Sequence, residues 1–190
     1  MINAAITLLA DQLNSFLRRK NSLHNDLVVV SNLYDMEKEK QDVIKNKLVV
    51  NLVNIQRITT PQLQAQGIHQ GNSVVEHEPP LFLNLYLLFA AHFDCKNYSE
   101  SLATLSDTLG FFQRKPTFDH YNSPCLDAGI EKLAMRIENL TLHELSNLWS
   151  MMGSKYCPSL LYQVQLITYY ADDIKTTHSA IASPTTEEHH

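Results

Sequence analysis

Three short groups of residues carry side chains that could act in catalysis or metal binding. His92 and Cys95 bring an imidazole and a thiol close together in the sequence, as a nucleophile with its base or a pair of metal ligands would require. The sequence identifies no third group that would orient the pair. We therefore interpret them as a histidine at a strand end and a buried cysteine, because free cysteines are usually buried.

The other two groups combine acids with histidines. Glu76, His77 and Glu78 are consecutive, and consecutive residues rarely converge on one ion, so we expect them in a solvated loop. Asp119 and His120 resemble half of a hydrolytic triad, but no paired serine or cysteine accompanies them, and we expect a turn. We predict no catalytic residue, no cofactor and no metal site.

Sequence motifs of common enzyme classes are absent. The chain lacks GxxxxGKS/T, GxGxxG, GxSxG and HExxH, and its five glycines offer little material for a phosphate cradle. The cysteines, Cys95, Cys125 and Cys157, are odd in number and widely spaced, without a CxxC pair. We expect reduced thiols in a protein made in the cytoplasm.

Aromatic residues near the C-terminal end are candidates for binding, because Trp and Tyr dominate the energetics of many interfaces. We place Trp149 in the core, since it lies in an apolar helical stripe. We name Tyr156, Tyr169 and Tyr170 as interface candidates. Tyr169 and Tyr170 are adjacent in a predicted strand and so face opposite ways, which leaves their roles open between an interface and the rim of the sheet.

A capped helix positions these aromatic residues. Thr141 and Glu144 have the spacing of a capping box, which begins a helix. Gly153 is placed to end the helix in the left-handed conformation, and Pro158 prevents the helix from resuming. The apolar stripe of this helix consists of Leu142, Leu145, Leu148, Trp149 and Met152.

Hydrophobic periodicity predicts the other elements. We expect one helix at Ile2–Lys20 and another that follows an Asn97 cap. Helices separated by pairs of strands predict an α+β fold, a single-domain sandwich of a largely antiparallel or mixed β-sheet with about three helices. The second helix presents the apolar face Tyr98, Leu102, Leu105, Leu109 and Phe112. The predicted strands are Leu27–Ser31, Leu48–Ile58, Leu81–Phe93 (buried on both faces), Glu131–Asn139 and Leu161–Tyr170.

Polar segments interrupt this pattern within a single domain that we place at residues 1–172. Thr59–Glu78 is rich in glutamine, and we expect a long mobile loop there. Asp35–Lys47 is a loop or a hairpin arm, Lys115–Asp127 is a connection, and residues 173–190 form a flexible tail. Interface candidates in the long loop are Gln62, Gln64, Gln66, His69 and Gln70.

Composition excludes several classes of partner. The formal net charge is −5 and the pI is about 6.0, which argues against nucleic acid and against an anionic membrane. No run approaches the roughly 20 apolar residues that cross a membrane. No basic region precedes an apolar core at the N-terminus, so we expect a cytoplasmic protein. The terminal histidines fit either native residues or the remnant of a tag.

The helix–strand unit resembles a known family. It reads LHELSNLWSMMG from Leu142 to Gly153. Together with the residues that follow, it is similar to the N-terminal domain of cap, or tail-terminator, proteins of extracellular contractile injection systems of the antifeeding-prophage and Photorhabdus-virulence-cassette type. The resemblance covers most of Ile2–Tyr170, including the strand that Pro79 and Pro80 precede. Its signature residues are Leu145, Trp149, Gly153, Tyr156, Pro158, Ser159, Tyr162 and Val164.

This resemblance implies a structural role without catalysis. Proteins of the family are expected to form a homo-oligomeric ring, a hexamer, on the distal end of the tube and sheath of a phage-tail-like particle and to end its polymerisation. The implied partners are further copies of the chain and the tube and sheath proteins. The residues leave two alternatives: a small cytosolic hydrolase with a Cys/His pair, and a monomeric assembly adaptor or chaperone.

Overall fold

A six-stranded mixed sheet forms the centre of the structure. The structure is a computed structural model that describes residues 1–22, 24–33, 44–58, 68–70, 73–78, 81–168 and 171–179. The first strand pairs with the second in parallel, and the other neighbours are antiparallel, which confirms the predicted α+β fold with a mixed sheet. The strands, in spatial order, are β1 (Val28–Val30), β2 (Lys47–Arg57), β5 (Phe82–His92), β8 (Ser159–Thr168), β7 (Ile130–Glu138) and β6 (Thr117–Asp119).

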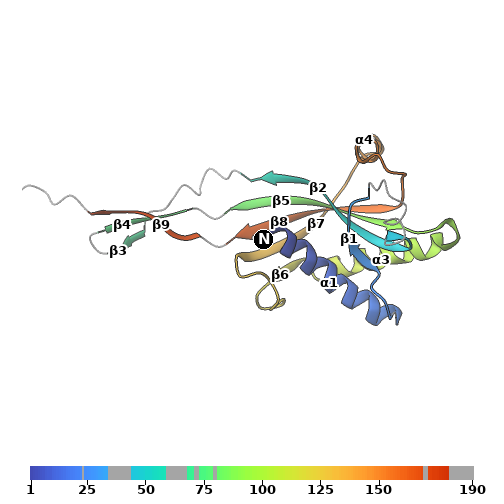
Figure 1. The fold of residues 1–190 in the computed structure, drawn as a ribbon, viewed down its shortest axis with the longest axis horizontal. Coiled ribbons are helices and arrows are strands. Elements are labelled where there is room, and N and C mark those ends of the chain that lie inside the picture. The colour runs from blue at the N-terminus through green and yellow to red at the C-terminus, as the bar shows by residue number, and fades with distance from the viewer. Residues whose placement is uncertain are drawn as a thin grey trace, which may run out of the picture.

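Helices cover both faces of this sheet (Figure 1). The inner face, as we call it, carries α1 (Ile2–Asn21) and α3 (Tyr98–Arg114), which follows a short 3-10 turn, η1 (Cys95–Asn97). The opposite, outer face carries α4 (Leu142–Met152). These three helices, and the five strands predicted from periodicity, lie where the sequence places them. The short strand β6 was not predicted, because it occupies a Pro-containing segment interpreted as a connection.

The inner face holds the larger apolar core. Phe112 of α3 lies between two aromatic rings of the sheet, with ring centroids 5.2 Å from Phe89 and 5.1 Å from Tyr162. Aromatic pairs of this kind contribute about 0.5–1.5 kcal/mol beyond their buried area. The alternation predicted for β8 is confirmed, since Tyr162, Val164 and Leu166 are buried in this core while Gln163 and Gln165 are half-exposed.

The outer face holds a smaller core under α4. Trp149 is 5% exposed there, which confirms its predicted core position. β5 contributes to both cores, as expected for a strand covered on both faces. Its residues Leu87 and Phe89 point inward and Leu88 and Ala90 point outward. The buried members of the outer core are Leu33, Ile44, Val49, Leu88, Ala90, Trp149 and Leu161.

A buried amide fastens α1 to the edge of the sheet. Asn14 is 8% exposed, and its Oδ1 accepts hydrogen bonds from the backbone N–H of Leu27 at 2.9 Å and of Val28 at 2.7 Å. Its Nδ2 donates to the carbonyl of Val28 at 2.9 Å. The side chain thus occupies the place that a neighbouring strand would take beside β1.

A second, three-stranded sheet extends away from the main sheet (Figure 1). It consists of β3 (Ile68–Gln70), β4 (Ser73–Glu78) and β9 (Ala171–Ser179). The described parts of the predicted long loop are therefore strands, and Ala171–Ser179 forms a strand rather than the start of a flexible tail. The sequence did not predict these strands, because they are rich in polar residues. Their pairing also joins segments about a hundred residues apart, such as Val74 with His178, so no local pattern indicates it.

The second sheet leaves the main sheet beside its two central strands. β4 precedes β5 in the chain, and β9 follows β8. At this point the Thr168 Oγ1 accepts from the backbone N–H of Leu81 at 2.8 Å, and the backbone N–H of Thr168 donates to the Leu81 carbonyl at 3.2 Å. These bonds hold the ends of the central strands in register.

Candidate functional site

The side chains that suggested catalysis belong to different elements of the structure. Cys95 lies in η1 and is exposed, so its prediction as a buried thiol is wrong: η1 lies on the surface between β5 and α3. His92 ends β5 and is half-buried, which confirms the strand-end position. Within the described part of the chain, no group of histidines, cysteines and acids could hold a metal ion.

The Asp119–His120 pair forms a turn, as predicted. Asp119 Oδ1 accepts from the backbone N–H groups of Tyr121 and Asn122, both at 3.0 Å. His120 Nε2 lies 2.9 Å from the carbonyl oxygen of Ile130. Both side chains therefore have structural partners. Glu76, His77 and Glu78 lie in β4, so their prediction as part of a solvated loop is wrong.

The cysteines differ in accessibility, which predicts their reactivity. Burial raises the pKa of Cys157 to about 11, so little of this thiol is ionised near neutral pH. We expect iodoacetamide to alkylate Cys157 at least tenfold more slowly than the exposed Cys95 and Cys125. Peptide mass spectrometry over a time course measures the three rates. Unfolding in urea is the control and should make the rates similar; equal rates in the folded protein would contradict this burial.

The capping box at the start of α4 is confirmed. The Thr141 hydroxyl oxygen accepts from the backbone N–H of Glu144 at 3.3 Å, and Glu144 Oε2 accepts from the backbone N–H of Thr141 at 2.8 Å. Gly153 ends the helix with φ 62°, the left-handed conformation that favours glycine. Asn97 occupies the corresponding position before α3 but makes no side-chain capping bond, so that predicted cap is wrong.

The cap makes the docking of α4 dependent on pH. Hydrogen bonds from the backbone and hydroxyl of Thr141 lower the pKa of Glu144. A lowered pKa in the folded state means that the stabilisation is present above the ordinary carboxyl pKa and is lost as pH falls through the folded value. We therefore expect α4 amide exchange, corrected for intrinsic rates, to lose protection below about pH 4. Glu144→Gln, which removes the titrating carboxyl, should abolish this pH dependence; an unchanged dependence would contradict the assignment.

The signature residues of the helix–strand unit have structural roles. The Pro158 carbonyl accepts from the backbone N–H of Ala91 at 2.9 Å and so begins the pairing of β8 with β5. Ser159 is the first residue of β8, and Leu145 packs on the outer core. Tyr162 is buried on the inner face, where burial raises its pKa to about 12.

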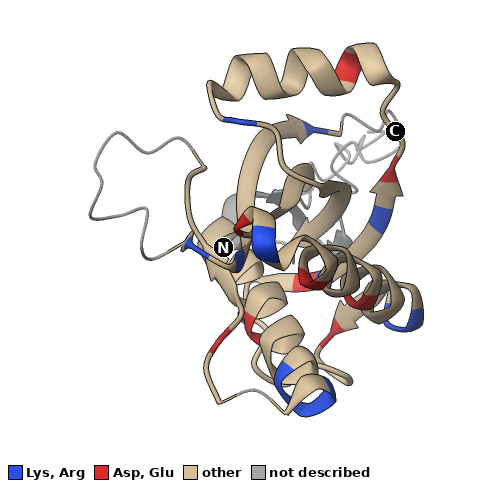
Figure 2. Cartoon of the chain, turned by 90° about the vertical axis from the view of Figure 1, so that its right-hand side faces the viewer, with Lys and Arg blue, Asp and Glu red and all other residues tan. Residues whose placement is uncertain are grey.

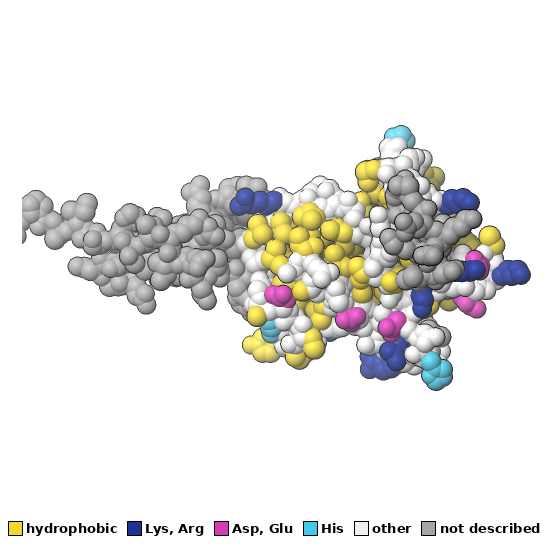
Figure 3. Space-filling model, in the orientation of Figure 1, with side chains coloured by type: hydrophobic (Ala, Val, Ile, Leu, Met, Phe, Trp, Pro, Cys, Tyr) yellow, Lys and Arg dark blue, Asp and Glu magenta, His cyan; other side chains and the backbone are white. Residues whose placement is uncertain are grey.

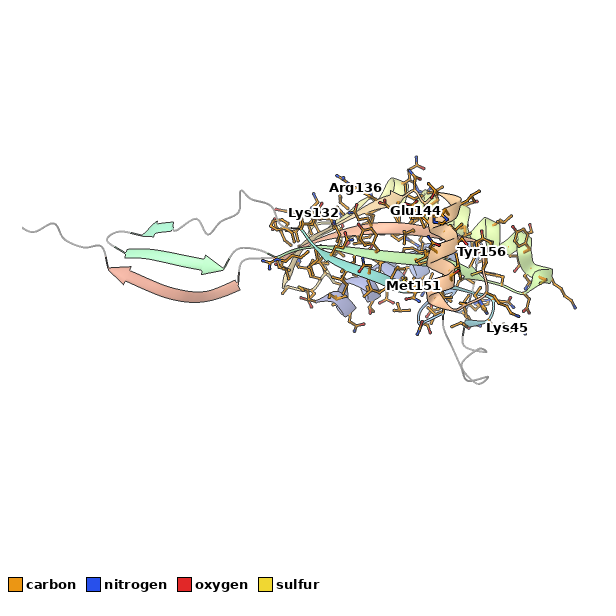
Figure 4. All side chains as sticks on the ribbon, turned by 90° about the horizontal axis from the view of Figure 1, so that it is seen from above. Lys45, Lys132, Arg136, Glu144, Met151 and Tyr156 are labelled. Atoms are coloured by element: carbon orange, nitrogen blue, oxygen red, sulfur yellow. The ribbon has the colours of Figure 1, made fainter. Side chains whose placement is uncertain are left out.

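The side of α4 that faces solvent mixes polar residues with two large apolar side chains, Leu142 and Met151. Leu142 is 86% exposed, so its predicted place in the buried stripe is wrong, and Met151 and Tyr156 are 70% and 64% exposed. Viewed from above, α4 lies across the sheet with Met151, Tyr156 and Glu144 along it (Figure 4). Glu144 is the one charged residue of the helix (Figure 2).

A surface hollow of about 430 Å³ lies along α4. The Trp149 ring forms part of its wall and lies edge-on to Tyr156, with ring centroids 5.5 Å apart. The Trp149 Nε1 is buried and has no hydrogen-bond partner in the described part of the chain. The lining contains no charged residue and consists of Leu142, Leu145, Ser146, Trp149, Ser150, Ser154 and Tyr156.

α3 is rotated relative to the sequence prediction. Tyr98, Leu102 and Leu109 were expected in the core, but they are 56%, 43% and 40% exposed. Leu105 and Phe112 are buried as predicted. The exposed three are spaced four and seven positions apart, so they lie on one face of the helix. We call this face the α3 ridge.

Hydroxyl side chains take the place of the expected leucines. Ser101, Thr104 and Thr108 are 1%, 5% and 0% exposed. Each donates to a backbone carbonyl of its own helix, those of Tyr98, Glu100 and Thr104, at 2.6–2.8 Å. Their polar groups are therefore satisfied without a partner elsewhere. Periodicity of apolar residues could not find this face, because it treats serine and threonine as surface residues.

Beyond α4 the outer face of the sheet is polar. Gln163 and Arg136 are paired across β8 and β7, and by alternation they share the face of Leu161. The Tyr86 hydroxyl donates to Gln56 Oε1 at 3.1 Å. Figure 4 shows Arg136 on this surface, with Lys132 farther from α4. A shallow hollow of about 150 Å³ is lined by Ile58, Asn84, Arg136, Gln163 and Gln165.

The predicted interface residues are only partly placed by the structure. Tyr156 is exposed beside the α4 hollow. His69 and Gln70 belong to β3. Gln62, Gln64, Gln66, Tyr169 and Tyr170 lie outside the described residues.

The sequence and the fold have counterparts among known proteins. The model of the Pvc16 N-terminal domain matches residues 4–183. This chain belongs to the Pvc16 N-terminal domain family. The family relationship confirms the resemblance drawn from the Trp149 unit, and no curated protein matches the sequence.

Two solved structures share the fold of this Pvc16 N-terminal domain. One is described as the sheath/tube terminator of PVC, an extracellular contractile injection system, in the extended state, with a TM-score of 0.60 and 13% identity. The other is described as the tube-terminating cap of the anti-feeding prophage, with a TM-score of 0.57 and 14% identity. The alignments cover 100% and 94% of this chain but 64% and 59% of those chains. The chain thus spans less than two thirds of either structure.

Proposed function

We propose that this chain is a structural part of a cap that ends polymerisation of the tube and sheath in a contractile injection particle. Membership of the Pvc16 N-terminal domain family carries the proposal. The fold it shares with a sheath/tube terminator and a tube-terminating cap supports it. Exposed apolar side chains on α3 and α4, such as Leu102 and Leu142, are of the kind that mediates protein contacts.

The proposed role is assembly into a homo-oligomeric ring, a hexamer, rather than catalysis. No helix among the described residues is long and apolar enough to cross a membrane. We propose that the chain is made in the cytoplasm and joins the particle there.

The contacts with tube and sheath are proposed to involve the polar outer face and the edge of β2. β1 pairs only with Leu48–Val50 of β2. Among the described residues, no strand pairs with Asn51–Arg57 on that side of β2. This open edge offers backbone groups to an incoming strand. Figure 3 shows apolar side chains gathered between β2 and the start of α1, and Ile55 and Met1 on these elements are each 43% exposed. Gln62, Gln64, Gln66, His69, Gln70, Tyr169 and Tyr170 remain proposed interface residues.

The experiment is polymerisation of tube and sheath proteins with and without this protein. Negative-stain microscopy should show shorter, more uniform filaments that carry density at one end. An equal amount of a folded, unrelated acidic protein is the control. Filament lengths and ends that do not change would refute the cap function.

A further inference from the structure

We infer that neighbouring copies contact each other by seating the α3 ridge of one copy in the α4 hollow of the next. This inference rests on the proposed function, because a cap of this kind requires a closed ring. It specifies which surfaces close the ring. The α3 ridge is Tyr98, Leu102 and Leu109, and the hollow is lined by α4 and Tyr156.

The two surfaces lie on opposite faces of the sheet. α3 packs on the inner core and α4 on the outer core (Figure 1). A ring needs a head-to-tail interface in which two different patches of each subunit meet. A chain with one apolar patch on each side of its sheet meets this requirement, whereas a single patch would favour a two-fold dimer. A second copy is therefore the occupant that explains both patches at once.

The dimensions of the two surfaces match. From Tyr98 to Leu109 the ridge extends about 16 Å, at 1.5 Å per residue. α4 has 11 residues and is also about 16 Å long. One surface projects as side chains from a helix, and the other is a hollow of about 430 Å³. Two helices of equal length can thus pack along their whole extent.

Neither surface brings an unpaired charge to the centre of the contact. α3 has three charged residues besides its neutral ridge: Glu100, Asp107 and Arg114. Asp107 accepts from Lys20 Nζ of α1 at 2.5 Å, and the Arg114 guanidinium lies 5.0 Å from the Phe16 ring centre. Only Glu100 is left at the margin. The lining of the hollow has serines as its polar residues and no charge.

The Trp149 indole supplies a second, independent observation at the hollow. Its side chain is 5% exposed, and its Nε1–H has no acceptor in the described residues. A buried donor without an acceptor destabilises a free chain. Because this nitrogen is itself shielded from solvent, the hydroxyl of Tyr98 on an incoming ridge would reach it only after α4 shifts.

The first test disrupts each surface separately. Leu102→Glu changes the ridge and Leu142→Glu changes the hollow, and both positions already face solvent, so the fold should survive. Tyr121→Glu is the matched control, because Tyr121 is 99% exposed and belongs to neither surface. Light scattering after size exclusion should show that each of the two variants weakens self-association at least tenfold while the control does not. Circular dichroism verifies folding.

The second test asks which surfaces meet. One preparation keeps Cys95, next to the ridge, with Cys125→Ser and Cys157→Ser. The other replaces all three cysteines by serine and carries Ser154→Cys in the hollow. A short bismaleimide should join one preparation to the other and leave each unlinked alone. Cross-links within the Cys95 preparation would show that ridges meet ridges and would overturn the inference.

The outcomes separate this inference from the cap function. If both surface variants keep the oligomeric mass of the wild-type protein, the two surfaces do not join copies and the inference fails. This holds even if the variants no longer cap filaments. In both cases the cap function stands. If the wild-type chain is monomeric alone, both tests are repeated with tube and sheath proteins present; absence of the cross-link there also overturns the inference. Failure of wild-type protein to alter filaments bears on the cap function alone.

Discussion

Replacing Asn14 with alanine is expected to lower the free energy of unfolding by about 2–4 kcal/mol. The substitution removes three hydrogen bonds and leaves the N–H groups of Leu27 and Val28 and the carbonyl of Val28 without their partner. Val28 is 5% exposed, so water cannot readily replace the amide. Urea unfolding followed by circular dichroism measures the change.

Asn3 provides the matched control for this prediction. It lies in the same helix and is exposed. Asn3→Ala should therefore be neutral or slightly stabilising, because alanine has the higher helix propensity. Equal effects at the two positions would mean that the Asn14 side chain does not fasten β1 to α1.

Replacing Trp149 with alanine is expected to cost about 3 kcal/mol and to release α4 from the sheet. Trp149 is the one buried residue of α4, and its neighbours Leu145, Leu148 and Met152 are only partly buried. The helix thus depends chiefly on the Trp149 side chain for its attachment. Hydrogen exchange should show that the α4 amides lose protection while those of α1 and α3 keep most of theirs.

Trp149→Phe separates packing from hydrogen bonding. Phenylalanine keeps an aromatic ring in the outer core but removes the indole N–H that has no partner among the described residues. We expect this variant to lose less than half the stability that the alanine variant loses. If both variants lose the same amount, the attachment of α4 does not depend on an aromatic side chain at this position.

The sequence contained enough information to predict the helix–strand unit around Trp149. Its capping box, left-handed glycine and proline act through neighbouring residues, so their spacing is sufficient. The alternation of β8 could be predicted for the same reason. The family resemblance came from this unit, and family membership confirmed it.

Long-range features could not be predicted in this way. The exposure of the α3 ridge depends on Ser101, Thr104 and Thr108 satisfying their hydroxyls within the helix. The exposure of Leu142 depends on how α4 packs on the sheet, where Trp149 is its one buried residue. The strands β4 and β9 are polar and pair across a long separation, so neither has a local signal. Both candidate surfaces of the molecule therefore arose from tertiary packing.

The connection between the two sheets gives the molecule a mechanical property. β4 runs into β5 and β9 follows β8, and these two central strands are paired over Phe82–Ala90. A pulling force on the three-stranded sheet would act along β5 and β8 in the same direction. It would load their hydrogen bonds to β2 and β7 in shear. Ladders loaded in shear share the force among many bonds at once, whereas a force that peels a strand breaks them one at a time. The anchorage at Leu81 and Thr168 thus suits a molecule that resists tension along its central strands.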